Sequence, residues 1–411
     1  MGDIQVKNLN VIFGKRKKEA LRLLNEGYSK ADILDKTGCT VGVYDASLDI
    51  KEGEIFVVMG LSGSGKSTLL RCFNRLIDPT SGTIVMDGKD IIKTSETELR
   101  ELRRKKMTMV FQHFGLLPHR TVSSNVGFGL EIQGVDEESR IKTAYETIET
   151  VGLKGYEEQM TGQLSGGMQQ RVGLARALAT NPEVLLMDEA FSALDPLIRN
   201  NMQDELLQLQ EKVHKTILFI THDLDEALKL GDRIAIMKDG KVVQVGTPEE
   251  ILTNPADDYV KAFVENVDRG DIVTARSIMF EKPASIRIDH DGPKVALRKM
   301  RQHGVTSLPV VDTSNTFLGF VKDTEMVEME EKGLDKISEY LHEKDEVTAV
   351  EPETPVAELL PLFLDNIYNM AVVDENKKLI GVVVHSSVIS EMIGVERKDV
   401  VQLKEEGGVD L

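Results

Sequence analysis

Cysteine is scarce in this sequence: Cys39 and Cys72 are the only two in 411 residues. They show neither the pairing pattern of a disulfide framework nor the spacing of a metal-ligand set, so we expect reduced thiols of a cytosolic protein.

Long apolar runs are also lacking. No window approaches the roughly 18 apolar residues that a membrane-spanning helix needs, and MGDIQVKNLNVIFGKRKK at the start lacks the apolar stretch of a signal peptide. Contact with a membrane is therefore expected only through a partner.

Basic residues are outnumbered, with 50 Lys and Arg against 68 Asp and Glu, and the formal net charge is -18. Such a surface repels nucleic acid and anionic lipid on average, so we expect no nucleic-acid partner. Two basic runs, KRKK (15–18) and RRKK (103–106), are interpreted as solvated faces, because charge runs of this kind usually are, and the alternative is contact with lipid.

The length predicts two or three domains, at about 100 to 200 residues each. Up to about residue 265, short apolar runs alternate with helical periods. This alternation predicts an α/β domain with a largely parallel sheet and functional loops at the strand ends. The strand-like runs are IFVVM (55–59), MTMVF (107–111), VLLMD (184–188) and TILFIT (216–221).

An internal repeat follows the α/β domain. Residues 295–321 and 356–383 share a helix, a turn, a strand ending in Val-Val-Asp, a polar turn and a second strand, with Val310 matching Val372 at a spacing of 62. We therefore predict two copies of one α+β unit. The predicted bounds are 1–266 for the α/β domain, 267–335 and 336–400 for the two copies, and 401–411 for a polar tail.

A glycine-rich loop joins the run IFVVM to a helix-prone segment. GLSGSGKST (60–68) fits G-x-x-x-x-G-K-[ST] in the strand-to-helix setting that this pattern requires. The glycines let backbone N–H groups wrap the phosphates of ATP, Lys66 neutralises the β and γ oxygens, and the Ser67 hydroxyl can ligate Mg²⁺. The alternative is a glycine-rich turn with an exposed lysine. The residues predicted to contact ATP are Gly60, Ser62, Gly63, Ser64, Gly65, Lys66, Ser67 and Thr68.

Two carboxylates follow four apolar residues in VLLMDEA (184–190). Asp188 is placed at the strand end to hold Mg²⁺ through water, and Glu189 is placed to orient or deprotonate the attacking water. His222 follows another strand and is a candidate donor to the γ-phosphate, while Gln112 follows MTMVF and is a candidate sensor of Mg²⁺ or water. Taken alone, each is more simply a polar residue at a strand end. Beside a phosphate loop they predict a catalytic set of Glu189, His222 and Gln112 and a metal site of Ser67, Gln112 and Asp188.

A second glycine pair occurs in LSGGMQQR (164–171). Ser165 is predicted to cap a helix, and a Ser-Gly-Gly helix N-terminus is an anion site in its own right. One phosphate loop leaves the γ side of ATP open. We therefore predict that a second copy of the chain completes the site, and the alternative is an ordinary capped helix. The residues concerned are Ser165, Gly166, Gly167 and Gln169.

Together these motifs resemble the complete set of an ATP-binding cassette (ABC) ATPase, over residues 1 to about 265. The resemblance implies a RecA-like P-loop core with antiparallel β and helical subdomains. It also implies two chains that dimerise head to tail around two molecules of ATP with Mg²⁺. In this family Glu189 would be the general base and His222 would contact the γ-phosphate. Gln112 would couple the site to a membrane partner, and Asp195 of SALD would join the two sites across the dimer.

The adenine-stacking residue departs from the family pattern. Members usually carry an aromatic residue in an early strand, and the segment before Ala46 has none where that stack falls. Phe13 resembles the missing element, displaced by the polar insert that follows it, and the alternative is that Phe13 packs in a core.

The insert, the segment FQHFGLLPHRTVSSNV and the downstream repeat resemble the ATPase subunit of glycine betaine and proline importers. This resemblance implies integral membrane permease subunits as partners, carrying or joined by a substrate-binding domain. It also implies a peripheral position at the cytoplasmic face of the cell membrane.

The repeat resembles a tandem pair of cystathionine β-synthase (CBS) domains, which bind adenine nucleotides in a cleft. Such domains commonly hold ribose with a Thr or Ser and an Asp three residues later, but this chain has Lys322 with Glu325, and Val384 with Ser387. A cyclic dinucleotide or a response to ionic strength therefore fits better than an ordinary mononucleotide. The alternative is a dimerising scaffold without a ligand.

Two rival functions belong to other classes. A soluble cassette protein acting on ribosomes or DNA is disfavoured, because the chain has one cassette, no heptad run and an acidic balance. A sensor with a degraded cassette is disfavoured, because the motif residues are intact: Lys66, Asp188, Glu189 and His222.

Overall fold

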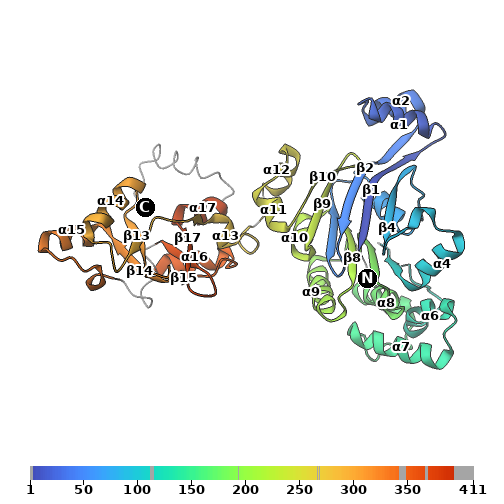
Figure 1. The fold of residues 1–411 in the computed structure, drawn as a ribbon. Helices are drawn as coiled ribbons and strands as arrows, with labels where there is room; N and C mark the ends of the chain where they lie inside the picture. The colour runs from blue at the N-terminus through green and yellow to red at the C-terminus, as the bar shows by residue number, and fades with distance from the viewer. Residues whose placement is uncertain are drawn as a thin grey trace. The chain divides into compact units, whose positions relative to one another are not determined.

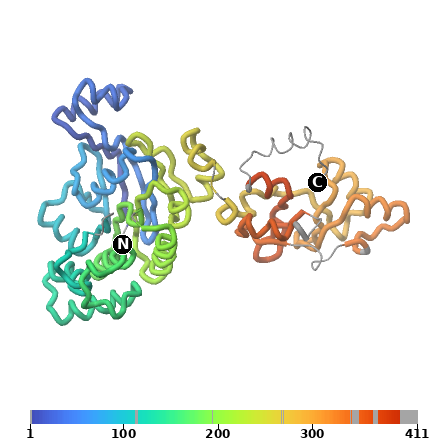
Figure 2. Tube along the Cα trace, turned by 180° about the vertical axis from the view of Figure 1, so that it is seen from behind, coloured from blue at the N-terminus to red at the C-terminus, as the bar shows by residue number. Residues whose placement is uncertain are grey.

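The computed structural model describes residues 3–111, 115–192, 194–265, 267, 269–341, 349–365 and 369–392. The chain forms two compact units, one of Met1–Ile251 with Pro255–Ala262 and one of Leu252–Asn254 with Phe263–Leu411 (Figures 1 and 2). No helix in the described part of the chain is both long and apolar enough to cross a bilayer.

A six-stranded sheet forms the centre of the first unit. Five neighbouring strands are parallel and only the edge strand β10 is antiparallel. The strands β3, β7 and β8 are buried along their whole length, as expected for a parallel sheet covered on both faces. In spatial order the strands are β10 (Lys241–Gly246), β9 (Arg233–Lys238), β3 (Ile55–Met59), β8 (Thr216–Thr221), β7 (Val184–Asp188) and β6 (Met107–Val110).

A second, antiparallel sheet packs near the first one. Apolar and polar residues alternate in β2, so that one face is buried and the other is exposed. Buried residues of both sheets and of α3 (Lys66–Phe73) belong to one hydrophobic cluster, which fixes α3 between the sheets. In spatial order the strands are β2 (Thr40–Ile50), β1 (Ile4–Phe13), β4 (Ser81–Met86) and β5 (Lys89–Asp90).

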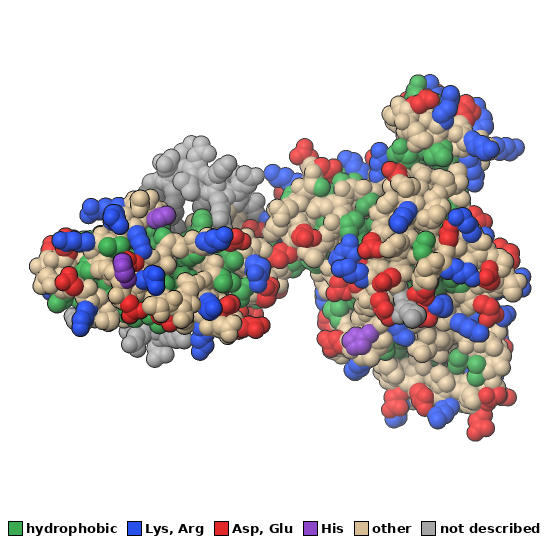
Figure 3. All heavy atoms as spheres, viewed as in Figure 1, with side chains coloured by type: hydrophobic (Ala, Val, Ile, Leu, Met, Phe, Trp, Pro, Cys, Tyr) green, Lys and Arg blue, Asp and Glu red, His purple; other side chains and the backbone are tan. Residues whose placement is uncertain are grey.

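A helical part has a hydrophobic core of its own, separate from that of the sheets. Its apolar residues include Val126, Ile148 and Val172, which come from three different helices and are fully buried. Charged side chains of both signs are scattered over its visible outer face (Figure 3). The elements are α5 (Val122–Val126), α6 (Phe128–Gln133), α7 (Glu137–Thr150), η2 (Thr161–Gln163) and α8 (Gly166–Ala179).

The polar insert between β1 and β2 folds as two helices, α1 (Lys17–Asn25) and α2 (Lys30–Thr37). Ser29 and Asp32 form a capping box that starts α2, and Gly38 ends it in the left-handed conformation. The helix pair shares a small apolar cluster with the ends of β1 and β2, separate from the cluster of the two sheets, and projects beyond the sheets in both views (Figures 1 and 2).

The remaining helices up to residue 264 belong to the first unit, except that the last two each have residues in both units. They are η1 (Ile91–Lys93), α4 (Glu96–Lys105), α9 (Pro196–Val213), α10 (Leu224–Leu230), α11 (Pro248–Thr253) and α12 (Asp258–Val264).

The second unit contains the predicted repeat. In both copies a hairpin shows the same irregularity in register: Val310 pairs with Gly319, and Val372 pairs with Gly381. The two sheets are β12 (Ile286–Arg287), β13 (Ser307–Val311) and β14 (Phe317–Lys322), and β11 (Phe280–Glu281), β17 (Leu379–Val383), β16 (Met370–Val373) and β15 (Ala349–Val350). The helices are α13 (Ala275–Ile278), α14 (Pro293–His303), α15 (Asp323–Lys332), η3 (Ile337–Glu339), α16 (Val356–Asp365) and α17 (His385–Met392).

The two copies of the repeat are joined by backbone hydrogen bonds. β11 comes first in the chain, yet it pairs with β17 in the sheet of the second copy. The turns of the two hairpins also bond to each other, because the Phe317 N–H donates to the Lys377 carbonyl and the Leu379 N–H donates to the Asn315 carbonyl, both at 3.0 Å. The sheet of the second copy is therefore completed by a strand from the first, and the hairpin turns bond the two copies to each other.

We expect the substitution Phe219→Ala in β8 to destabilise the first unit by about 3 to 5 kcal/mol, since it leaves a cavity in a core that cannot fully collapse. Phe219 is 0% exposed and its ring lies 5.6 Å from that of Phe191. Differential scanning calorimetry should show the melting transition of this unit lowered by roughly 10 °C. The control is Leu76→Ala, whose side chain is 54% exposed and should change the stability by less than about 0.5 kcal/mol. Equal melting temperatures for the two variants would contradict this packing.

Candidate functional site

The glycine-rich loop lies between β3 and α3 and packs closely against neighbouring backbone. A Cβ atom on Gly60 would lie 2.2 Å from the Met237 carbonyl oxygen, and one on Gly65 would lie 2.3 Å from the Gly42 carbonyl oxygen. Both glycines have positive φ angles, 149° and 103°. Only glycine fits at these two positions. The close packing holds the loop in one conformation, in which its backbone N–H groups can bond to a ligand.

Lys66, the first residue of α3, extends back over this loop. Its Nζ donates to the carbonyl oxygens of Gly60 at 2.8 Å and Leu61 at 3.1 Å. Burial lowers the pKa of the Lys66 amine, and the nearby carboxylates Glu189 and Asp188 oppose that shift. The cation is thus already desolvated and aimed at the concave side of the loop, where phosphate oxygens would bind.

The loop holds an unused polar atom. The Ser64 hydroxyl oxygen is buried and has no hydrogen-bond partner among the described residues. Buried polar atoms normally make a hydrogen bond. A buried hydroxyl without one, in a glycine-lined loop, is evidence that a bound ligand supplies the missing partner. The loop and its orphan fit the phosphates of a nucleotide.

Ser67 and Asp188 are brought together from α3 and the end of β7. The Ser67 hydroxyl donates to Asp188 Oδ1 at 2.8 Å, and an Nη of Arg71 lies 3.2 Å from Asp188 Oδ2. Asp188 is buried. A hydroxyl and one carboxylate beside a phosphate loop suit Mg²⁺, which usually takes one or two carboxylates together with substrate phosphates and water. No cluster of three or more His, Cys, Asp or Glu able to hold a metal occurs among the described residues, and Gln112, the third predicted ligand, lies outside them.

Glu189 and His222 meet at the ends of the adjacent strands β7 and β8. His222 Nδ1 lies 3.5 Å from Glu189 Oε2. Glu189 has a φ of 46°, which is uncommon for a residue with a side chain, and its N–H donates to the Ile220 carbonyl at 3.1 Å. The bond across the strands holds this backbone conformation and directs the carboxylate toward the imidazole.

The Ser-Gly-Gly segment begins α8 in the helical part. Ser165 is the N-cap residue, and its hydroxyl accepts a bond from the Met168 N–H at 3.4 Å. Gly166 is exposed, and a Cβ atom added to it would have no other atom within 4 Å. The Gln169 amide donates to the carbonyls of Thr161 and Leu164, both at 3.2 Å, so this side chain braces the turn before the helix. The segment therefore presents serine and glycine to solvent from a core that is separate from the core under the glycine-rich loop.

Asp195 begins α9 and lies in the turn after β7. Its carboxylate accepts a bond from the Ile198 N–H at 3.0 Å, which makes it the N-cap. A Cβ atom on Gly167 would lie 2.7 Å from a methyl of Ile198, so this turn and the start of α8 are neighbours within the chain. Leu197 next to it is exposed.

Phe13 ends β1 and is 41% exposed. Gly42 explains its position: a Cβ there would lie 2.9 Å from the Phe13 ring and 3.0 Å from the Thr68 methyl. The missing side chain lets the ring lie beside the first turn of α3. An exposed aromatic ring at this place is available for stacking.

Sequence reasoning did not single out two residues of this site, Arg71 and Gly42. Arg71 lies four residues after Ser67 on one face of α3, and that helical spacing could have revealed it. Gly42 is a contact between strands distant in sequence, for which one sequence offers no signal.

The second unit contains a hollow of about 400 Å³ between the two copies of the repeat. The Ser387 hydroxyl is buried without a partner among the described residues, and the Glu325 carboxylate is used to cap α15 by accepting the Lys322 N–H at 2.9 Å. Val384, but neither Lys322 nor Ser387, lines the hollow. The lining residues are Phe280, Glu281, Lys282, Pro283, Ala284, His303, Val305, Ser307, Leu308, Pro309, Phe320, Asn369, Val382 and Val384.

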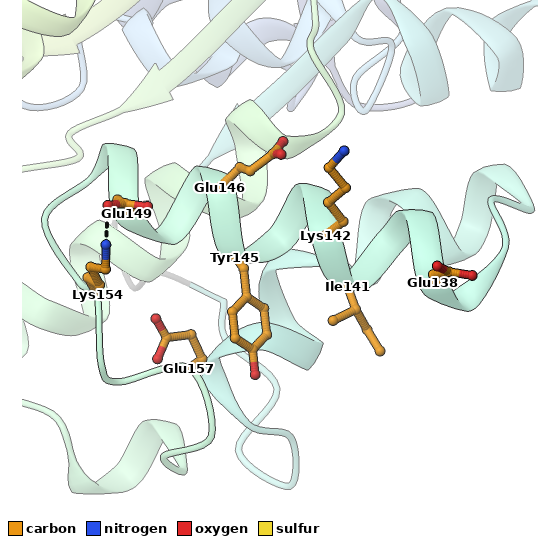
Figure 4. Close-up of a pocket in the computed structure, with 8 residues that line it drawn as sticks. All are labelled: Glu138, Ile141, Lys142, Tyr145, Glu146, Glu149, Lys154 and Glu157. Carbon is orange, nitrogen blue, oxygen red and sulfur yellow. Dashed lines mark hydrogen bonds and ion pairs between the residues drawn. The ribbon is translucent and has the colours of Figure 1, made fainter.

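Another hollow, of about 460 Å³, lies on the outer face of α7 (Figure 4). Ile141 and Tyr145 form its apolar part, and Lys154 is paired with Glu149 across its end. None of the predicted site residues lines it. The lining residues are Glu138, Ile141, Lys142, Tyr145, Glu146, Glu149, Lys154 and Glu157.

Two family models match the chain. The ABC transporter model matches residues 43–192, and the CBS domain model matches residues 275–331 and 337–394. The solved structure of MJ0796 as a dimer, a bacterial ABC transporter cassette, aligns with a TM-score of 0.51 at 33% identity, covering 60% of this chain and 98% of that one.

Several named relatives are similar over nearly the whole chain. GbuA of Listeria monocytogenes serotype 1/2a (strain 10403S), a glycine betaine/carnitine transport ATP-binding protein, is 52% identical over 96% of this chain and 99% of its own. OpuAA of Bacillus subtilis (strain 168), a glycine betaine transport ATP-binding protein, is 51% identical over 95% of this chain and 92% of its own. ProV of Escherichia coli (strain K12), a glycine betaine/proline betaine transport system ATP-binding protein, is 49% identical over 92% and 95%.

The predicted family and fold class are thereby confirmed, with a P-loop core, an antiparallel sheet and a helical part in the first unit and the paired repeat in the second. The chain belongs to the ABC transporter family of ATP-binding proteins, and it carries a tandem pair of CBS domains.

Proposed function

We propose that this chain is the ATP-hydrolysing subunit of a membrane importer for glycine betaine or a related quaternary ammonium osmolyte. The observation that carries the proposal is the similarity to glycine betaine transport proteins along almost the entire chain, insert and CBS pair included. The alternative, a soluble ABC ATPase acting on ribosomes or DNA, has no such relative among these proteins.

The geometry supports a division of labour within the nucleotide site. Lys66 and the loop from Gly60 to Thr68 would hold the phosphates, with Phe13 stacked on adenine. Ser67 and Asp188, with Gln112, would hold Mg²⁺, whose chemistry is to neutralise charge on the phosphate oxygens.

Hydrolysis would then depend on the pair at the ends of β7 and β8. Glu189 would accept a proton from the attacking water, and His222 beside it would orient Glu189 and donate to the γ-phosphate. The constrained backbone of Glu189 supports this role, because strained residues held by their surroundings cluster at functional sites.

A second copy of the chain would complete each site. Ser165, Gly166 and Gly167 lie at an exposed helix N-terminus of the helical part, which has its own core, so they are suited to bind a phosphate held by another chain. Asp195 would lie between the two sites of a head-to-tail dimer. The solved relative MJ0796 is itself described as dimeric.

The other partners would be integral membrane permease subunits, carrying or joined by a substrate-binding domain. The chain would then sit peripherally at the cytoplasmic face of the membrane. The transport names of the relatives support this location.

The CBS pair would regulate hydrolysis by binding a nucleotide such as a cyclic dinucleotide in the 400 Å³ hollow. The exposed Phe280 ring offers a stacking surface there, and Lys282 and His303 offer basic groups near phosphate. A ligand regulates only insofar as it binds the open and closed states of the dimer unequally.

We expect Glu189→Gln to bind ATP and form an ATP-dependent dimer, while its turnover falls by about 100-fold or more because no base activates the water. Size-exclusion chromatography and a phosphate-release assay measure the two effects. Uptake of labelled glycine betaine by cells that express the permease should fall with turnover. The matched control is Glu183→Gln at the other end of β7, a surface carboxylate paired with Lys106, which should keep wild-type values. Wild-type turnover in Glu189→Gln would disprove the assignment of the base.

We expect Phe13→Ala to weaken ATP binding roughly tenfold, the usual effect of losing an aromatic stack on a base. Phe13→Tyr should restore the affinity, since the ring is kept. Tyr28→Ala, an exposed aromatic residue of the adjacent insert, serves as the control and should leave the dissociation constant unchanged. Equilibrium dialysis with labelled ATP measures all four proteins. An unchanged affinity in Phe13→Ala would assign the ring to packing.

We expect cyclic di-AMP to bind the full-length protein in isothermal titration calorimetry and Phe280→Ala to weaken that binding about tenfold, through loss of stacking in the hollow. Val327→Ala, an exposed apolar side chain on α15 outside the hollow, is the control. No heat with the wild-type protein would refute the nucleotide. A salt titration of the ATPase rate would then separate an ionic-strength sensor, whose rate changes with salt, from a scaffold, whose rate does not.

A further inference from the structure

Two helices begin directly at turns that carry predicted site residues. α9 starts at its N-cap Asp195, and α10 starts at its N-cap Asp223, the residue after His222. In both cases the capping carboxylate accepts a backbone N–H three residues later, at 3.0 Å for Asp195 and 3.2 Å for Asp223. The position of each turn is therefore tied to the position of its helix.

The two helices are joined to each other by three polar pairs, whose members on the α10 side, Asp223, Glu226 and Lys229, are three residues apart. The Arg199 guanidinium lies 3.2 Å from the Asp223 carboxylate, the Gln203 amide donates to the Glu226 carboxylate at 3.1 Å, and Lys229 lies 2.7 Å from Asp204. Gln203 and Glu226 are buried, and burial raises the pKa of the Glu226 carboxyl. α9 and α10 are thus constrained to move together.

Arg199 does more than join two helices. One terminal nitrogen, Nη1, donates to Asp223 Oδ2, and the other, Nη2, donates to the Leu194 carbonyl, both at 3.2 Å. A single planar guanidinium therefore contacts the residue after His222 and the residue before Asp195. Its third nitrogen, Nε, is buried without a partner among the described residues, and leaving a buried donor unbonded carries a desolvation cost. The arginine is held here in spite of that cost.

Lysine would not hold the same bridge rigidly. An ammonium can bond to two carbonyl oxygens, as that of Lys66 does, but all its donors sit on one nitrogen at the end of a flexible stem. The guanidinium instead holds two separate nitrogen donors in one rigid plane, each directed at a different acceptor.

We propose that Arg199 is a positioning residue that couples the turn Leu194–Asp195 to His222. The coupling rests on the proposed function, in which Asp195 lies between the two ATP sites of a dimer while His222 serves the site of its own chain. A shift of the Asp195 turn caused by the other site is then passed through Arg199 and Asp223 to His222. Hydrolysis at the two sites becomes linked, and Arg199 itself touches neither ATP nor the attacking water.

The test uses the full chain and four variants. Arg199→Lys keeps the charge and loses the bridge, and Asp223→Asn keeps the helix cap and loses the charge. The double variant asks whether the two act as one unit. Lys229→Met is the matched control, because it breaks the polar pair of the same two helices that is farthest from both turns.

We expect Arg199→Lys and Asp223→Asn each to lower kcat for ATP about tenfold with KM within about twofold, and to lower the Hill coefficient of hydrolysis toward 1. The double variant should be no slower than the slower single variant, since residues that act as a unit are not additive. Lys229→Met should keep the wild-type kcat and Hill coefficient. The melting temperatures of all four should be similar, so that the loss in kcat separates from any loss in stability.

Three results would overturn the proposal. These are a wild-type kcat and Hill coefficient in Arg199→Lys, effects of the two substitutions that add in the double variant, and an equal loss of kcat in Lys229→Met. A wild-type chain that hydrolyses ATP without cooperativity would instead remove the dimer from the proposed function, and the coupling with it. Cooperative wild-type hydrolysis with an unaffected Arg199→Lys would refute the coupling alone.

Discussion

The hydrogen bond between the Ser67 hydroxyl and the Asp188 carboxylate, 2.8 Å long, joins two residues that are distant in the chain. It forms because β3, β8 and β7 are adjacent and parallel, so that their carboxyl ends meet at one edge of the sheet. The glycine-rich loop, His222 and Glu189 follow the same three strands. The arrangement of the whole nucleotide site therefore depends on strand order and register, which the buried faces of these strands hold in place.

The first unit is built from cores that do not merge. The glycine-rich loop rests on the core of the two sheets, the Ser-Gly-Gly segment rests on the core of the helical part, and the α1–α2 insert has a third small core. Parts with separate cores can shift relative to one another without breaking either core. In the proposed dimer, the glycine-rich loop of one chain and the Ser-Gly-Gly segment of the other would form one site, and such a shift would let that site open and close.

The paired repeat of the second unit follows a different rule. β11 and the crossed bonds between the hairpin turns tie each copy to the other, and apolar residues of both copies, Phe320 and Val382 among them, share one cluster. The hollow of about 400 Å³ is bounded by residues from both copies, so its shape depends on how they pack. A ligand that favours one packing over another would be sensed by the pair as a whole.

Local pattern in the sequence determined a large share of this protein. The largely apolar runs of β3, β7 and β8, the glycine loop ahead of a helix and the cap at Ser165 depend on neighbours in the chain, and the structure shows each as an element or a cap. The repeat was also visible, because both copies obey the same local rules. The roles assigned to the site residues stay predictions.

Only the tertiary structure decided which distant residues meet. Gly42 lets Phe13 lie beside α3, β11 joins the sheet of the second copy, and Arg199 bridges Leu194 and Asp223. Each of these contacts joins residues that no repeating pattern in the sequence connects. They arise from packing and from the bonding of buried polar groups, which are satisfied in three dimensions and leave no pattern along one chain.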